Sequence, residues 1–185
     1  MEPIFMDVDG VLADFAGSVI KYYDLPRIDP PYWDWVIDAY KKKYPDETEK
    51  SFWAGLEEDF WINLPELPEA KDILKLVKRF GEPVLLTCPT WFSAGYRQAW
   101  IRKHYPDMFY SNRYIISPGK KYLSAPGRVL IDDSDQNIAD WRAHGGSGIL
   151  VPGSYNRNRG KDILRTVDHG LVNIFFFKGG NHEVH

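Results

Sequence analysis

The chain has a single cysteine, Cys88, among its 185 residues, which excludes an internal disulfide and fits a reducing compartment. No apolar run approaches the roughly 20 residues of a membrane-spanning helix. Basic residues are not in excess: 23 lysines and arginines against 26 aspartates and glutamates argue against a broad nucleic-acid-binding face. The first residues lack the basic region and cleavage site of a secretory signal. These absences predict a cytoplasmic protein with no membrane segment and no nucleic-acid polymer as its partner.

Strand and helix patterns alternate along most of the chain. A short apolar run ends at Asp7, and the remaining expected strands cover 83–87, 113–116, 128–131 and 147–151. Between and after them, helical spacing of apolar residues covers 69–80, 93–104, 135–143 and 160–169. Such alternation is typical of a parallel sheet with helices on both faces. The sequence therefore predicts an α/β fold with a Rossmann-like, three-layer core.

Residues 15–65 differ from the rest of the chain. They hold 12 of the 28 aromatic residues and are repeatedly broken by proline. This composition predicts a small helical insertion after the first strand, with helices near 12–23, 31–43 and 47–57. We expect most of its rings to form a core of their own, while a few line a pocket. The expected units are a core of 1–14 and 66–175, the insertion, and a flexible tail over 176–185.

The first strand is followed by two aspartates, Asp7 and Asp9, and then by Gly10. An aspartate that ends a strand before a turn presents its carboxylate at the carboxyl edge of the sheet. Two such carboxylates near one point provide a place where a cation and a phosphate can meet, as phosphoryl transfer through an aspartyl nucleophile requires. The alternative is a plain Asp-Gly turn, which is a common structure.

Two further strands also end in polar residues. The strand over 83–87 ends at Thr87, and the strand over 128–131 is followed by Asp132 and Asp133. Ligand sites of open α/β sheets lie beyond the carboxyl ends of the strands, so these residues are expected to converge with Asp7. Three polar strand ends in one sheet favour a catalytic site over an isolated turn.

The order Asp-x-Asp, Ser/Thr, Lys, Asp-Asp resembles that of the haloacid dehalogenase-like phosphohydrolases. The segment Asp7–Phe15 is similar, more narrowly, to the cytosolic 5′(3′)-deoxyribonucleotidase family, as are Phe60-Trp61-x-x-Leu64-Pro65 and Leu130-Ile131-Asp132-Asp133. The resemblance extends to about Val151 and is loose in the insertion. It implies that the insertion is the small cap that this superfamily places over its active site.

The resemblance also implies roles for the residues of the first and last motifs. Asp7 would be the nucleophile that forms an aspartyl-phosphate. Asp9 would protonate the leaving alkoxide and then activate water. Asp132, with Asp133 beside it, would hold Mg²⁺ together with Asp7 and the backbone carbonyl of Asp9. Hard oxygen ligands without histidine or cysteine favour magnesium over zinc.

Phosphate contacts are expected from the middle motifs. Thr87 would hydrogen-bond a phosphoryl oxygen, and the backbone N–H of Cys88 would lie close to the same group. A lysine would offset charge on the transferring phosphoryl group. Lys120 and Lys121 both stand at a suitable distance before Asp132, and Lys121 is slightly favoured. A nucleophilic role for Cys88 is rejected, because no histidine is near it in sequence and the aspartates already serve.

The implied substrate is a small phosphomonoester, most naturally a (deoxy)nucleoside monophosphate, because a cap limits access by polymers. Six aromatic residues are candidates for stacking on the base: Phe15, Phe52, Trp53, Phe60, Trp61 and Trp91. The alternatives are a sugar-phosphate or other small-metabolite phosphatase and a phosphotransferase. A non-catalytic binding module is disfavoured, because every motif aspartate is present. Similar nucleotidases are often homodimers.

Some polar residues receive a structural interpretation. Asp14 is expected to cap the first helix of the insertion or to lie in the second shell of the metal. Four arginines are assigned to the surface: Arg97, Arg102, Arg157 and Arg159, of which the last two could reach a partner. The histidines of the 179–185 segment resemble a metal cluster, but a terminal tail is favoured.

Overall fold

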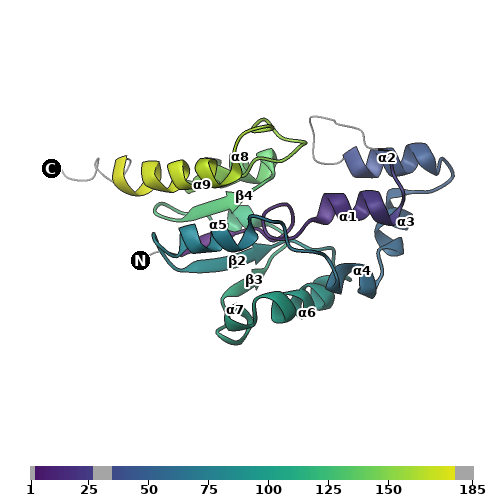
Figure 1. Cartoon of the computed structure of the whole chain (residues 1–185), viewed down its shortest axis with the longest axis horizontal. Coiled ribbons are helices and arrows are strands. Elements are labelled where there is room, and N and C mark those ends of the chain that lie inside the picture. Colours follow the sequence, from purple (N-terminus) through teal and green to yellow (C-terminus); the bar gives the residue numbers. More distant parts are fainter. Residues whose placement is uncertain (1–2, 27–34, 178–185) are drawn as a thin grey trace.

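The computed structural model describes residues 3–26 and 35–177 (Figure 1). Its sheet has five parallel strands in the order β3-β2-β1-β4-β5. The strands are β1 (Ile4–Met6), β2 (Pro83–Thr87), β3 (Tyr114–Ile116), β4 (Val129–Asp132) and β5 (Ser147–Leu150). Flanking helices are α5 (Ala70–Val77), α6 (Ala94–His104), α7 (Pro106–Tyr110), α8 (Asp135–Ala143) and α9 (Ile163–Val172), with the short turns η1 (Lys120–Leu123) and η2 (Asn173–Phe177).

Alternate residues of β1 point to opposite faces of the sheet, and both faces are covered. Ile4 and Met6 belong to the large apolar core that includes residues of α5 and α9. Phe5 belongs to a smaller core on the other face, where Ile138 and Trp141 of α8 pack against it. A central strand buried on both sides explains its continuous apolar run. The predicted α/β fold with a Rossmann-like parallel sheet is confirmed.

Four helices lie between β1 and α5: α1 (Phe15–Tyr22), α2 (Trp35–Lys43), α3 (Glu49–Gly55) and α4 (Glu58–Ile62). This group of helices, referred to as the cap, occupies the place of the insertion that the sequence predicts. In Figure 1 the first three of these helices lie beyond the carboxyl ends of the strands. The two connections to the core run side by side: Asp14 N–H donates to Pro65 O (2.9 Å) and Leu67 N–H to Leu12 O (2.8 Å). The cap is thus joined to the core by two segments that hydrogen-bond to each other.

The elements of the cap are shorter than the sequence predicts. The helix expected from residue 12 begins at Phe15, because the Asp14 carboxylate accepts the Gly17 N–H (2.9 Å) and caps it. The start of the helix expected over 31–43 and most of the expected tail fall outside the described residues. Helix α4 was not predicted. Within the described ranges no helix is long and apolar enough to cross a membrane.

Candidate active site

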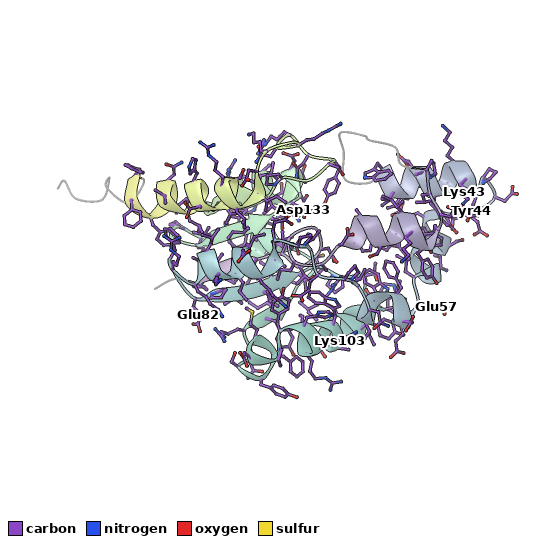
Figure 2. The ribbon with its side chains drawn as sticks, in the orientation of Figure 1. Lys43, Tyr44, Glu57, Glu82, Lys103 and Asp133 are labelled. Carbon is purple, nitrogen blue, oxygen red and sulfur yellow. The ribbon has the colours of Figure 1, made fainter. Side chains whose placement is uncertain are left out.

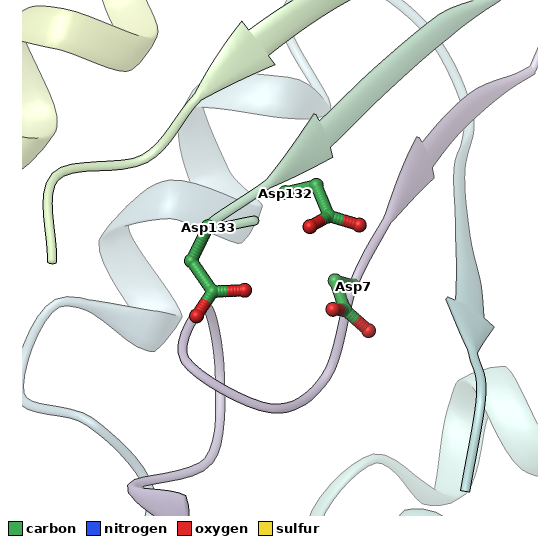
Figure 3. Close-up of side chains that lie close together, drawn as sticks. All are labelled: Asp7, Asp132 and Asp133. Atoms are coloured by element: carbon green, nitrogen blue, oxygen red, sulfur yellow. The ribbon is translucent and has the colours of Figure 1, made fainter. Parts of the chain in front are cut away.

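Three carboxylates meet at the carboxyl edge of the sheet, as the strand ends predict. Asp7 follows β1 directly, Asp132 is the last residue of β4, and Asp133 comes next. One carboxylate oxygen from each lies within 4.8 Å of the others (Figure 3). All three residues are buried. In the view of the whole chain, Asp133 lies between the sheet and the cap (Figure 2).

Gly10 lets the turn after β1 approach this cluster. Its φ is +72°, a conformation that residues with a Cβ rarely adopt. A Cβ at this position would also overlap the Asp133 carboxylate and crowd the Tyr155 hydroxyl. The glycine of the Asp-x-Asp-Gly segment is therefore required for both its backbone conformation and its small volume.

The buried lysine of the cluster is Lys120. Its Nζ lies 2.7 Å from Asp7 Oδ2 and 2.7 Å from Asp132 Oδ2, and only 5% of the residue is exposed. Lys121 instead places its ammonium over the ring of Tyr122, 5.6 Å from the centroid. The preference for Lys121 is therefore corrected: the turn η1 directs the first lysine inward and the second outward.

The cluster has more negative than positive charge. Burial raises the pKa of Asp7 to about 7, an effect that Lys120 opposes and Asp132 reinforces. Burial and the two neighbouring aspartates also raise the pKa of Asp133 well above its usual value. Burial lowers the pKa of Lys120, but the attraction of Asp132 and Asp7 outweighs it and the net shift is upward. One ammonium faces three carboxylates.

This donor set fits a hard divalent cation. All the available ligand atoms are carboxylate oxygens, as Mg²⁺ prefers. Asp133 Oδ1 is buried and has no hydrogen-bond partner among the residues that the structure describes. Buried oxygens are normally satisfied, so an unpaired one beside two other carboxylates is the place where a bound cation would contribute most.

Neighbouring residues orient the metal-site carboxylates. Asn137 Nδ2 lies 3.2 Å from both oxygens of Asp132, and Ser134 N–H donates to Asp132 Oδ1 (2.8 Å). The Tyr155 hydroxyl donates to Asp133 Oδ2. None of these partners was singled out from the sequence. Ser134 and Asn137, just after the Asp-Asp pair, could have been, whereas Tyr155 lies in a loop without a motif.

Arg97 is a second correction. It was assigned to the surface but is completely buried. Its Nη2 lies 2.7 Å from Asp9 Oδ1 and 2.6 Å from Asp9 Oδ2. The Asp9 side chain, 20% exposed, thus points to an arginine 88 residues away rather than into the carboxylate cluster. A pairing at this sequence separation has no local pattern by which it could be predicted.

A cavity of about 410 Å³ opens onto the cluster. Its lining comes from the strand ends and from the cap: Asp7, Asp9, Phe15, Trp53, Trp61, Cys88, Pro89, Thr90, Lys120, Ser134 and Asn137. Thr87, which precedes Cys88, is buried and does not line the cavity, and its hydroxyl has no hydrogen-bond partner in the described part of the chain. Partial burial raises the pKa of the Cys88 thiol, which disfavours the nucleophilic thiolate.

The six candidate stacking residues separate into three groups. Phe15, Trp53 and Trp61 line the cavity. Phe52 and Phe60 are buried in the cap and do not line the cavity, so the expectation that they stack on a base is corrected. Trp91 is 91% exposed and lines an adjoining apolar groove of about 690 Å³, which shares Trp53 and Thr90 with the cavity.

Comparison with known proteins agrees with the fold. The structure resembles a HAD-family hydrolase of Deinococcus radiodurans R1, crystallised with phosphate and sodium, with a TM-score of 0.55 and 16% identity over 90% of this chain and 88% of that one. For a haloacid dehalogenase-like hydrolase of Xanthomonas campestris the TM-score is 0.56, with 13% identity over 94% of each chain. At these identities the likeness shows the fold alone.

Sequence comparison identifies the family. The mitochondrial 5′(3′)-deoxyribonucleotidase of Mus musculus is 27% identical in an alignment 143 residues long, which covers 70% of this chain and 63% of that protein. The chain thus spans less than two thirds of this curated relative. A family model described as "5′ nucleotidase, deoxy (Pyrimidine), cytosolic type C protein" matches residues 1–169. The chain therefore belongs to this 5′ nucleotidase family, as the resemblance predicted.

Proposed function

We propose that the chain is a Mg²⁺-dependent phosphomonoesterase that hydrolyses (deoxy)nucleoside monophosphates to nucleoside and phosphate through an aspartyl-phosphate at Asp7. The observation that supports it is the convergence of Asp7, Asp132 and Asp133 with the Lys120 ammonium at a cavity walled by cap aromatics. Membership of a nucleotidase family supports the same class of reaction.

In the first step, an oxygen of Asp7 attacks phosphorus while the bond to the leaving oxygen breaks. Asp9, which lines the same cavity, gives its proton to the leaving alkoxide. In the second step, Asp9 takes a proton from water, the water oxygen attacks phosphorus, and the bond to Asp7 breaks. Phosphate is released, and both aspartates return to their starting states.

Charge on the transferring group is balanced by the buried groups around it. Lys120 remains protonated across the neutral range, because its raised pKa follows from its two carboxylate partners. Thr87, next in the chain to the cavity residue Cys88, offers a buried hydroxyl that has no partner among the described residues. Asp7, Asp132, Asp133 and the carbonyl of Asp9 would hold Mg²⁺, which when bound would polarise the phosphoryl oxygens.

The cavity supports a nucleoside as leaving group. Phe15 stacks on Trp53 at 17° between planes and on Trp61 at 21°, so the wall offers nearly parallel flat rings. Flat rings favour flat ligands such as a nucleobase over a sugar alone. With about 410 Å³ available, the cavity has the size of small-molecule sites and not of a polymer groove.

The test is phosphate release from a panel of deoxynucleoside, ribonucleoside and sugar monophosphates, with Mg²⁺ and with EDTA. The proposal predicts Mg²⁺-dependent release that is fastest for nucleoside monophosphates. Release mainly from sugar phosphates would retain the mechanism and overturn the substrate class, which is the second candidate function. Release that is unchanged in EDTA would contradict the role of the carboxylate cluster.

Location and assembly stay predictions. The family description contains the word cytosolic, whereas the name of the curated mouse relative contains the word mitochondrial. A cytoplasmic location is therefore a proposal that the single cysteine alone supports. A homodimer remains the expectation from similar nucleotidases, and sedimentation of the purified chain measures it.

A further inference from the structure

Arg97 lies between two indole rings. Its guanidinium carbon is 5.4 Å from the centroid of Trp61, in cap helix α4, and 5.7 Å from that of Trp100, in core helix α6. Both indoles are anchored, because Trp61 Nε1 donates to Leu56 O (2.8 Å) and Trp100 Nε1 to Leu64 O (2.8 Å). The guanidinium plane is thus confined from two sides.

Among the residues that the structure describes, Asp9 is the only carboxylate that pairs with this arginine. Its Nη2 donates to Asp9, while Nε and Nη1 are buried without a hydrogen-bond partner in the described part of the chain. Leaving donors unpaired in a dry site costs stability. Within the described residues, the side-chain hydrogen bonds of this buried guanidinium all go to Asp9.

The same stack reaches the wall of the cavity. Trp61 packs on Phe15 with centroids 5.5 Å apart, and Phe15 packs on Trp53 at 6.0 Å. All three rings line the cavity, and all three come from the cap. The cap rings therefore support the arginine that contacts Asp9, whose side chain belongs to the core.

We propose that Arg97 is a positioning residue that acts through Asp9, and that the cap ring of Trp61 holds it in place for this role. The proposal rests on the proposed function, in which Asp9 transfers protons. Arg97 Nη2 lies 2.7 and 2.6 Å from the two Asp9 oxygens, so the guanidinium holds this side chain at the cavity while Asp9 transfers its proton to the leaving alkoxide. The same contact keeps that carboxylate in place to take a proton from water in the second step.

The experiment uses the full chain with Arg97→Met, Arg97→Lys, Asp9→Asn and the double variant Arg97→Met with Asp9→Asn. Arg102→Met is the matched control, because Arg102 is an exposed arginine of the same helix. We expect Arg97→Met to lower kcat on a deoxynucleoside monophosphate by about 10²-fold, since general acid–base catalysis contributes about 10²–10⁴-fold. KM is expected to change little, because Arg97 does not line the cavity.

Two readouts separate positioning from a structural role. In a single turnover, Arg97→Met should slow release of the nucleoside far more than release of 4-nitrophenolate from 4-nitrophenyl phosphate, whose weakly basic leaving group needs little protonation. The double variant should be no slower than Asp9→Asn alone, because both changes remove one function. Arg97→Lys, which keeps the charge but not the planar group, should lose less than Arg97→Met.

The outcomes are distinguishable from failure of the proposed function. Equal losses for both leaving groups, or additive losses in the double variant, would overturn the positioning role. An active wild type whose Asp9→Asn variant is inactive and whose Arg97 variants match Arg102→Met would overturn the inference alone. A wild type without phosphatase activity on any panel compound would overturn the proposed function and this inference with it. If Arg97→Met does not fold, Arg97→Lys carries the same comparisons.

Discussion

At the scale of single residues, the site is governed by one buried ammonium. Lys120 lies 2.7 Å from both Asp7 and Asp132, where the three clustered carboxylates repel one another. Removing a buried cation leaves uncompensated charge, which costs more than an exposed pair contributes. The ammonium of its neighbour Lys121 instead lies over the ring of Tyr122. Two adjacent lysines thus provide a matched pair of substitutions.

We expect Lys120→Met to lower phosphatase activity by at least about 10²-fold, because a buried charge facing the transferring group is lost. In EDTA the same change should lower the free energy of unfolding by about 3 kcal/mol. Lys121→Met should retain both properties within about twofold in rate and 0.5 kcal/mol in stability. Steady-state kinetics and urea unfolding measure the two effects, and a greater loss in Lys121→Met would refute the assignment.

At the scale of secondary-structure elements, two short segments connect core and cap, and hydrogen bonds join these segments to each other. Asp14 closes it on one side, because its backbone N–H pairs with Pro65 and its side chain caps α1. Helix α1 has only eight residues, so its first turn is a large part of it. The helix carries Phe15, which forms the wall of the cavity.

Asp14→Ala should therefore destabilise the protein by about 1 kcal/mol, the usual cost of losing an N-cap side chain. Asp14→Asn keeps a capping oxygen, so its free energy of unfolding should stay within a few tenths of a kcal/mol of the wild-type value. Denaturant unfolding followed by circular dichroism measures both. Equal stability of the wild type and both variants would show that the N-cap hydrogen bond of α1 contributes nothing to the free energy of unfolding.

The elements that the sequence predicts well are those with a local cause. Asp7, Thr87 and Asp132 could be predicted to lie near one another because each ends or directly follows an apolar strand, and parallel strands share one carboxyl edge. The sequence does not show which lysine points into the site, since Lys120 and Lys121 are neighbours in the same short helix η1 and their directions depend on where that helix begins. Arg97 was missed because its partner is 88 residues away.

Phe52 and Phe60 could not be distinguished from the rings that line the cavity, because all of them are aromatic residues of the same insertion.

At the scale of the whole molecule, Asp133 of the acidic cluster lies between sheet and cap (Figure 2). Burial raises the pKa of two carboxylates of this cluster, Asp7 and Asp133. Without a cation, the folded protein binds a proton at Asp7 between the unfolded pKa of 3.8 and the folded pKa of about 7. The unfolded chain has released that proton in this range. Stability contributed by the protonated form is therefore present at low pH and is lost as the pH rises toward 7.

In EDTA, we expect the melting temperature of wild type to fall relative to that of Asp7→Asn as the pH rises from about 4 to 7. With Mg²⁺ the order should reverse at neutral pH, because binding requires the ionised carboxylate and stabilises only the protein that supplies it. Thermal unfolding of both proteins across this range measures the crossing. Parallel curves in EDTA, with no response to Mg²⁺ in the wild type, would contradict the charge balance described for the cluster.

The most direct measurement is Mg²⁺-dependent phosphate release from a deoxynucleoside monophosphate by wild type, Asp7→Asn and Asp14→Asn. Asp14→Asn is the matched control, because it makes the same chemical change seven residues away and keeps the helix cap. The proposed function predicts release by wild type and Asp14→Asn and none above background by Asp7→Asn. Release by Asp7→Asn at the wild-type rate would contradict an aspartyl nucleophile at the end of β1.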